Sequence, residues 1–329
     1  MNIDRQPTTP PAGPGNYPGY PGYPGYPGAY GAPPAYPPAG YPMYPNGMYA
    51  PPAPPPVSPA SALLPTPDPQ EARHYGRVGK VPWTLAQTLL GAGITIVPWL
   101  LLIVLEQVVS ASAGGSVKTH RLPVAVDIVG GVIFLLFTAV VEGAFLLAPL
   151  IIAIRNRTPG TTRWGALRAL GLRGTRFWPA AGWVALGLIV VFAVSIIYST
   201  LITTFHLPLQ TNGETLMQEA QTMPFTVIGA LIGAAVIAPF CEEIFFRGFL
   251  FAGLLRGMNV LWATLLSAFL FTLVHGDIGS ALPLFAIGLM LAIIRWRTGS
   301  VWPGMALHML NNSLAAIAVI LVIVGAAPK

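Results

Sequence analysis

The feature that most constrains this chain is a series of long apolar runs, which begins at Val81 and continues almost to the C-terminus. A helix needs about 20 predominantly apolar residues to cross the hydrocarbon core of a bilayer. Only 9% of the 329 residues are charged and 54% are hydrophobic, whereas an ordinary soluble domain carries about 25% charged residues. The composition therefore excludes a typical water-soluble enzyme and predicts an all-α, polytopic transmembrane helical bundle.

About seven spans are expected in this bundle. The apolar runs cover residues 81–109, 122–154, 177–204, 225–250, 260–275, 281–294 and 301–324. The fifth and sixth runs are short, which is acceptable for helices that face other helices or a polar cavity instead of lipid. Lys and Arg gather in alternate connections, and such connections lie on the cytoplasmic side. The formal charge of +6 is thus explained by membrane topology, and no nucleic-acid partner is expected.

Residues 1–74 have a different composition from the rest of the chain. They contain most of the 35 prolines and 11 tyrosines, including consecutive Tyr-Pro-Gly triplets, and few charges. This composition favours polyproline II and turns over a packed core. We therefore expect a disordered Pro/Gly/Tyr-rich cytoplasmic tail, followed by transmembrane helices with a basic interfacial segment in residues 75–224 and a transmembrane core in residues 225–325. The excess of Arg over Lys is typical of a bacterial protein, so we expect a bacterial cell membrane.

Ionisable residues inside the spans are concentrated in the last third of the chain. Each one costs about 2.5 to 3.5 kcal/mol at the centre of a membrane helix, so a group of them indicates function. The polar candidates and one neighbouring aromatic are Glu242, Glu243, Arg247, Phe271, His275, His308 and Asn312. Glu243 and Arg247 are four residues apart, which favours an ion pair on one helix face. Glu242 is turned about 100° away from Glu243 and is free to face another helix.

Residue counting places these side chains at comparable depth. At about 1.5 Å per helical residue, Glu242 and His275 both lie roughly 22 to 27 Å from the tight connection near Gly257. An antiparallel hairpin would bring them level. His308 is somewhat shallower, but a tilt of the last span would allow it to reach the same region. Three helices are thus expected to bring a carboxylate and two imidazoles together.

The ordered motifs resemble those of a known family. E-E-x-x-x-R at Glu242, F-x-x-x-H at Phe271 and H-x-x-x-N at His308, on successive spans, resemble the CPBP intramembrane proteases. This family comprises type II CAAX prenyl endopeptidases, Abi proteins and bacteriocin-related members. The resemblance covers roughly residues 224–324 and implies an endopeptidase that hydrolyses a peptide bond within or beside the bilayer. The expected partner is a membrane-embedded or lipidated peptide or protein.

The resemblance implies a role for each of these residues. Glu242, near His275, would take a proton from the attacking water as a general base. His308 and Asn312 would donate hydrogen bonds to the tetrahedral oxyanion, and Phe271 is expected to contact substrate. Glu243 and Arg247 would hold the helix face. A metalloprotease is also compatible with the sequence, because Glu242, His275 and His308 can complete a three-ligand zinc site.

Other interpretations of the same residues stay open. Glu242, Glu243 and Arg247 could form only a structural ion cluster, in a non-catalytic scaffold or bacteriocin-immunity protein. Intramembrane Glu and His also form the proton relays of transporters. Cys241 is assigned no role, because a lone buried cysteine is usually a small core residue. Asp127 and Glu142, in the second span, either lie near an interface or line a cavity.

Overall fold

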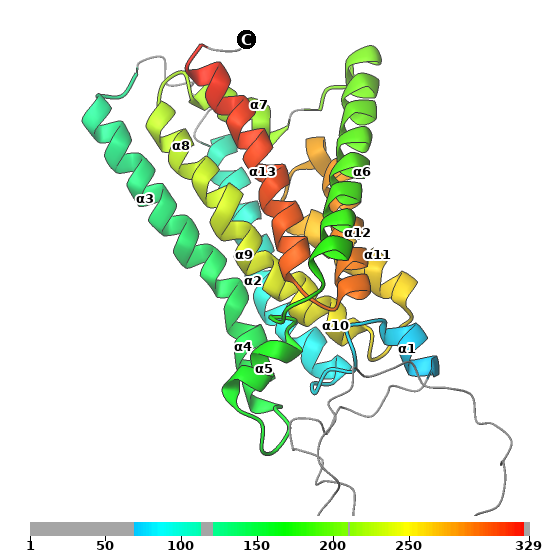
Figure 1. Cartoon of the computed structure of the whole chain (residues 1–329). Helices are drawn as coiled ribbons and strands as arrows, with labels where there is room; N and C mark the ends of the chain where they lie inside the picture. Colours follow the sequence, from blue (N-terminus) through cyan, green and yellow to red (C-terminus); the bar gives the residue numbers. More distant parts are fainter. Residues whose placement is uncertain (1–68, 113–120, 210, 326–329) are drawn as a thin grey trace, which may run out of the picture. The chain divides into compact units, whose positions relative to one another are not determined.

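The structure is a computed structural model of the chain and describes residues 69–112, 121–209 and 211–325 (Figure 1). All regular secondary structure in these residues is helical. The helices before residue 220 are α1 (Pro69–Tyr75), α2 (Leu85–Ser112), α3 (Val124–Gly143), η1 (Ala144–Leu146), α4 (Leu147–Arg155), α5 (Arg163–Ala169), α6 (Phe177–Thr204) and α7 (Asn212–Glu219). The later ones are α8 (Pro224–Ile232), η2 (Gly233–Ile237), α9 (Ala238–Glu242), η3 (Glu243–Leu250), α10 (Phe251–Leu254), α11 (Val260–Val274), η4 (Ile278–Ser280), α12 (Ala281–Thr298) and α13 (Trp302–Ile323).

The predicted all-α polytopic bundle is confirmed. Among the residues that the structure describes, six helical segments are long and apolar enough to cross a membrane, and α11, with 15 residues, is a shorter apolar helix. The expectation that the sixth span is short was wrong, because η4 and α12 together form a segment of 21 residues, Ile278–Thr298. Gly299 ends this segment in the left-handed conformation, with φ of 72°. The predicted tail lies outside the described residues, apart from residues 69–74 in α1.

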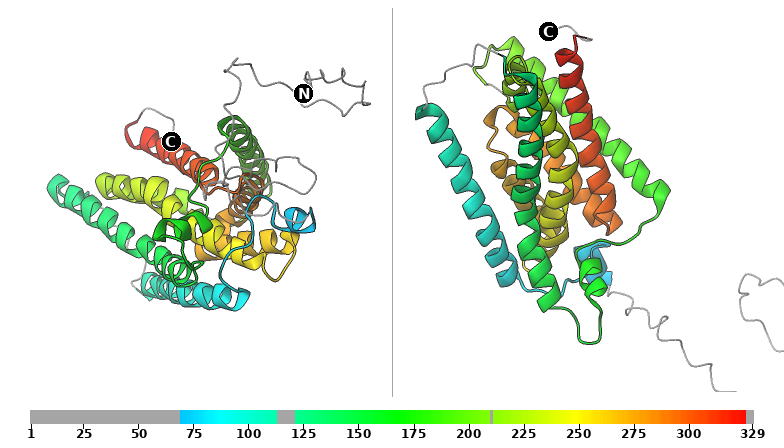
Figure 2. Two further views of the ribbon diagram at one scale, coloured as in Figure 1. Left: turned by 60° about the horizontal axis from the view of Figure 1, so that its bottom comes forward. Right: turned by 90° about the vertical axis from the view of Figure 1, so that its left-hand side faces the viewer.

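A continuous rod, formed by α8, η2, α9, η3 and α10, runs through the interior of the bundle. We call this segment, Pro224–Leu254, the central rod. In the most apolar 18 residues of the central rod, 44% is buried inside the protein, whereas the corresponding share in the α3–α4 segment is 11%. α3 packs along α8 (Figure 2), and α12 packs against α6, α11 and α13. The helices around the rod leave many apolar side chains exposed to the surroundings, as expected for helices that face lipid.

Asp127 is a structural residue of this bundle. Its carboxylate accepts hydrogen bonds from the backbone N–H groups of Phe225 and Thr226, at 2.9 and 2.8 Å, and from the Thr226 hydroxyl. These contacts cap the N-terminus of α8, where a negative charge is favourable. Nearby, Gly131 faces the backbone of Phe225 so closely that a Cβ would lie 2.4 Å from its oxygen. Asp127 therefore fixes the start of the central rod against α3.

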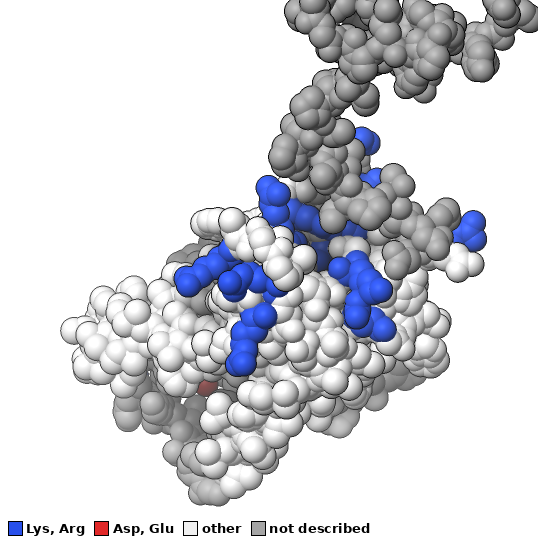
Figure 3. Space-filling model, turned by 90° about the horizontal axis from the view of Figure 1, so that it is seen from below, with Lys and Arg blue, Asp and Glu red and all other residues white. Residues whose placement is uncertain are grey.

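Basic residues gather at one end of the bundle. The start of α6 and the ends of α4, α10 and α12 lie at this end, which Figure 3 shows from below with its Lys and Arg side chains in blue. Trp178, near the start of α6, is 81% exposed, as expected for an interfacial anchor. Trp83, which also lies near the start of a span in the sequence, is not an interfacial anchor. Its side chain is fully buried and packs on Phe249, with ring centroids 5.6 Å apart.

Candidate active site

The two adjacent carboxylates lie where the central rod changes its helical winding. Glu242 ends α9, and Glu243 begins η3, an eight-residue π-helix. A second π-helical stretch, η2, precedes α9. π-Helical segments are rare in proteins overall, but those that occur are often found at functional sites. Every residue of η3 is buried, including Glu243 and Arg247, so the rod places charged groups in the interior.

The predicted ion pair between Glu243 and Arg247 is present. Arg247 Nη1 donates to Glu243 Oε1 at 2.8 Å, and both side chains are fully buried. Arg247 Nη2 also donates to the carbonyl of Gly288 on α12, at 3.3 Å. The guanidinium carbon lies 4.2 Å from the centroid of the Phe271 ring, which is a cation–π distance. Arg247 thus joins the central rod to α11 and α12.

Arg295 supports the same part of the rod. It lies in the last turn of α12 and is only 1% exposed. Its Nε donates to the backbone carbonyl of Arg247 at 3.1 Å, and its Nη1 donates to the carbonyl of Gly299. The π-helical winding of η3 alters the regular pattern of backbone hydrogen bonds, and Arg295 supplies a donor to it. Arg295 is therefore a structural cation.

His308 on α13 faces both carboxylates. Its Nδ1 lies 3.4 Å from Glu243 Oε1, and its Nε2 lies 3.9 Å from Glu242 Oε2. The imidazole is 2% exposed and Glu242 is 6% exposed. Gly304, one turn before His308, allows this approach, because a Cβ there would lie 2.8 Å from Glu243 Oε2. Two helices far apart in the sequence thus place an imidazole between two buried acids.

Several polar atoms of this cluster have no hydrogen-bond partner among the described residues. They are Oε2 of Glu242, Oε2 of Glu243 and Nδ1 of His308. An unsatisfied buried polar group costs about 1 to 3 kcal/mol, and more when it is charged. Such groups are retained where a ligand or a reacting molecule uses them. The cluster therefore has the character of a reaction site more than that of a completed structural network.

His275 is held at the end of α11 by Phe271. Its Nδ1 lies 2.7 Å from the Phe271 carbonyl oxygen, which can only accept, so Nδ1 carries the proton and donates. The neutral ring then has Nε2 as its acceptor. Phe271 is fully buried, and its ring centroid lies 4.5 Å from that of His275 and 5.5 Å from that of His308. Phe271 thus separates and positions the two imidazoles, and its predicted contact with substrate stays a prediction.

His275 and Glu242 were predicted to lie near each other, but they do not form an ion pair in this structure. In the part of the chain that is described, His275 pairs with no carboxylate, and His308 is the imidazole next to Glu242. The cause is the position of His275 beyond the last turn of α11, where its backbone begins a turn. Counting residues gives depth along a helix, but it does not give the direction of a side chain at a helix end.

Asn312 contacts the other π-helical stretch. Its Nδ2 donates to the carbonyl of Ala234 in η2 at 2.9 Å, and Asn311 Nδ2 donates to its Oδ1 at 3.2 Å. Asn312 lies four residues after His308, as the motif predicts, but its amide is bonded to the rod in this arrangement. Its role as an oxyanion donor stays a prediction.

Glu142 is a residue of the site that sequence reasoning left undecided. It lies at the end of α3, is 8% exposed, and has an Oε2 without a partner among the described residues. It lies near Glu242 and Cys241. The signal in the sequence was an acidic residue within an apolar span, which indicates a functional role. The missing information was the contact of α3 with α9.

The predicted zinc ligands do not form a set in this structure. Among the residues that the structure describes, no group of three His, Cys, Asp or Glu side chains is arranged to hold a metal ion. Glu242 and His308 face each other, but His275 is directed by its bond to Phe271. We therefore derive no reaction step through a metal, and the metalloprotease alternative stays untested.

Comparisons with known proteins agree with the position of this site. Residues 224–314 match the model of the family "Type II CAAX prenyl endopeptidase Rce1-like". The chain is also 26% identical over 172 residues to the Bacillus subtilis (strain 168) protein named "Putative membrane peptidase YdiL", which covers 52% of this chain and 66% of that protein. No solved structure matches the chain significantly. The matched segment contains Glu242, Glu243, Arg247, His275, His308 and Asn312, so the similarity to this family includes every polar residue of the predicted site.

Proposed function

We propose that the chain is an intramembrane endopeptidase that hydrolyses a peptide bond of a membrane-embedded or lipidated protein or peptide. The observation that carries this proposal is the position of His308 between two buried carboxylates, with unsatisfied polar atoms on all three residues. The family match and the name of the relative support the same class of activity.

Glu242 and His308 are suited to hold the attacking water. Glu242 Oε2 and His308 Nε2 are 3.9 Å apart, which is too far for a direct hydrogen bond. A single water oxygen can lie about 2.8 Å from both atoms. Such a water would donate one hydrogen bond to the Glu242 carboxylate, and its contact with His308 Nε2 would orient the water oxygen. Glu243 is already bonded to Arg247, so Glu242 is the better general base.

The proposed reaction proceeds through a tetrahedral intermediate. The water oxygen bonds to the scissile carbonyl carbon while Glu242 accepts the water proton. The carbonyl oxygen becomes an oxyanion, and His308 or Asn312 donates to it. The C–N bond then breaks, and Glu242 returns its proton to the leaving amine. His275 is placed by Phe271 to contact the peptide beside this centre.

The chain is proposed to lie in a bacterial cell membrane with its basic face toward the cytoplasm. Arg157, Arg163 and Arg176 lie in or beside the connections between α4, α5 and α6, and cytoplasmic loops carry such an excess of positive charge.

N-terminal profiling of membrane proteins tests the proposed activity. Membranes that contain wild-type chain would be compared with membranes that contain Glu242→Gln, and with Glu219→Gln as a control at an exposed acid on α7. New N-termini should appear with the wild type and the control, and not with Glu242→Gln. A farnesylated CAAX peptide would test one substrate class in parallel. Equal cleavage by Glu242→Gln, or no cleavage that depends on the folded wild-type chain, would refute the proposal.

A further inference from the structure

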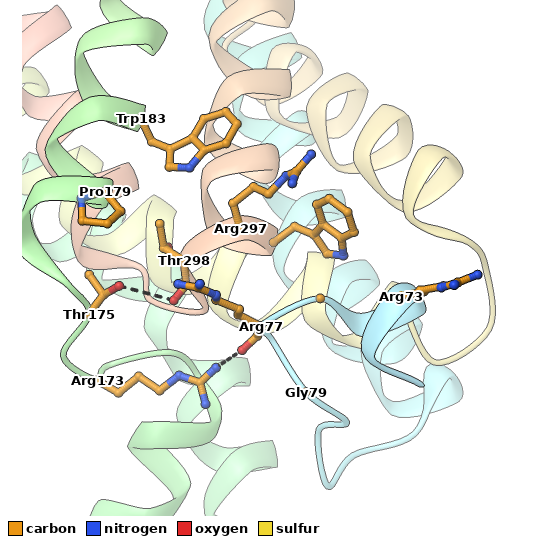
Figure 4. A pocket seen from close by; sticks show the side chains of 11 residues that line it. Arg73, Arg77, Gly79, Arg173, Thr175, Pro179, Trp183, Arg297 and Thr298 are labelled. Carbon is orange, nitrogen blue, oxygen red and sulfur yellow. Dashed lines mark hydrogen bonds between the residues drawn. The ribbon is translucent and has the colours of Figure 1, made fainter. Parts of the chain in front are cut away.

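A cavity of about 840 Å³ lies at the basic end of the bundle, separate from the carboxylate cluster. Three segments supply its charged wall: the connection after α1, the connection before α6, and the end of α12. Figure 4 shows Arg77, Arg173 and Arg297 arriving from these segments, with Arg73 of α1 at the edge. Segments that are distant in the sequence thus bring four arginines to the lining of one cavity.

Among the described residues, no Asp or Glu lines the cavity, and none of the four arginines forms an ion pair there. The four arginines line one cavity, although their side chains extend in different directions (Figure 4). An anion that entered the cavity would therefore meet uncompensated positive charge from several sides.

Two of the arginines are held in place. Arg173 donates from Nε to the carbonyl of Gly299 at 2.6 Å and from Nη2 to that of Val78 at 3.2 Å. Burial lowers the pKa of Arg173 from its ordinary value, so its charge is only partly solvated. Arg297 lies over two indole rings, at 4.7 Å from the centroid of Trp296 and 5.5 Å from that of Trp183. A positioned guanidinium loses less freedom when it binds an anion.

The backbone around the cavity is shaped to bring these groups together. Gly76 has φ of 55°, and a Cβ there would lie 2.5 Å from Trp296 Nε1. Gly299 has φ of 72°, and a Cβ there would lie 2.4 Å from the carbonyl oxygen of Arg77. The N–H of Arg77 donates to the carbonyl of Trp296 at 3.0 Å. Only glycine fits such close approaches in the left-handed region, so the cavity is a built feature.

The level of the cavity indicates which anion it meets. The spanning segment α6 begins at Phe177, and the spanning segment that contains α12 ends at Thr298, beside the cavity. Phe177 and Trp178 are 70% and 81% exposed at the same level, which is typical of aromatic residues at a membrane interface. The anion that is concentrated at this level is the phosphate of a phospholipid headgroup.

We propose that this cavity binds the phosphate-bearing headgroup of an anionic phospholipid. The arginines, with Arg77 and Arg297 foremost, contact the phosphate, and Trp183 and Pro179 contact the glycerol and the first methylene groups. Basic pockets between transmembrane helices on the cytoplasmic side recognise headgroups in this way. The argument for this lipid site does not rest on the proposed peptidase activity.

Native mass spectrometry of the full chain tests the proposal. Delipidated protein in mild detergent would receive equal amounts of phosphatidylglycerol and phosphatidylcholine with identical acyl chains. The wild type should retain phosphatidylglycerol preferentially. Arg77→Gln should weaken this retention about fivefold, and Arg77→Gln with Arg297→Gln about twentyfold or more. The Arg77 side chain is exposed and makes no hydrogen bond in the described residues, so Arg77→Gln should fold normally.

Matched controls separate the cavity from general surface charge. Arg163→Gln with Arg168→Gln removes two exposed charges of α5 on the same face and should leave the lipid preference unchanged. An equal loss in this control, or full retention by the cavity variants, would overturn the proposal. Inorganic phosphate is the second probe. Displacement of phosphatidylglycerol by millimolar phosphate, with the same dependence on Arg77, would identify free phosphate as the ligand and contradict the lipid assignment.

Discussion

His308 Nε2 on α13 lies 3.9 Å from Glu242 Oε2 on the central rod, and both side chains are buried. This pair brings together the two motifs that are farthest apart in the family segment. We expect Glu242→Gln to lower kcat by about 10² to 10⁴, because the amide cannot accept the water proton. His308→Ala should give a loss of similar size, and His275→Ala a smaller one. Turnover of a peptide identified by N-terminal profiling would measure these losses, with Glu219→Gln as the control.

Arg247→Ala should destabilise the bundle by about 3 to 5 kcal/mol, because it leaves the fully buried Glu243 charge without its partner. Thermal unfolding in detergent, followed by the exposure of Cys241 to a thiol reagent, would measure the change. Removal of both charges, in Glu243→Leu with Arg247→Met, should recover much of the lost stability. A single variant as stable as the wild type would show that the ion pair contributes little.

Gly304→Ala should move the carboxylate of Glu243, since the added Cβ would lie 2.8 Å from its Oε2. We expect a cost of about 1 to 3 kcal/mol, typical of an overpacked interior, and a lower kcat. Gly182→Ala on α6 is the matched control, because a Cβ there meets no atom within 4 Å. It should be neutral or slightly stabilising, since alanine is a better helix former than glycine. Equal behaviour of the two variants in unfolding and activity measurements would contradict this explanation.

Asp127→Ala should lower stability by about 0.5 to 2 kcal/mol through loss of the cap on α8. Its kcat should stay close to that of the wild type, because Asp127 on α3 contacts Phe225 and Thr226 at the start of the central rod, whereas Glu242 lies about four helical turns further along. Asp127→Asn keeps an acceptor oxygen and should lose less stability. A large fall in kcat at unchanged stability would instead assign Asp127 to the reaction.

A chelator should leave the activity unchanged, because His275 is directed by its bond to the Phe271 carbonyl and does not join Glu242 and His308 in a ligand set. The assay would compare turnover before and after treatment with 1,10-phenanthroline. Inhibition that Zn²⁺ reverses would show that Glu242, His275 and His308 close around a metal in the active state.

The sequence allowed the spans and the ion pair to be predicted, because both depend on local periodicity. The expected runs agree with the observed segments Phe177–Thr204 and Trp302–Ile323 to within one or two residues. Glu243 and Arg247 remain close even though η3 is π-helical. Hydrophobicity and spacing along a single helix are sufficient for both features.

The features that depend on contacts between helices could not be predicted in the same way. The choice of His308 over His275 as the neighbour of Glu242 depends on how α11 ends and how closely Gly304 lets α13 approach. The proximity of Glu142 depends on the crossing of α3 and α9. Trp83 has the position in the sequence of an interfacial anchor, but it packs on Phe249 in the interior.

The carbonyl of Gly299 accepts hydrogen bonds from two guanidinium groups, those of Arg173 at the basic cavity and of Arg295 in the interior. Arg295 also holds the backbone of Arg247, which is bonded to Glu243. A displacement of the Gly299 carbonyl at the basic cavity should therefore also move the Glu243–Arg247 ion pair. We expect purified samples that carry different amounts of residual lipid to differ in specific activity, even when their protein content and folding are the same.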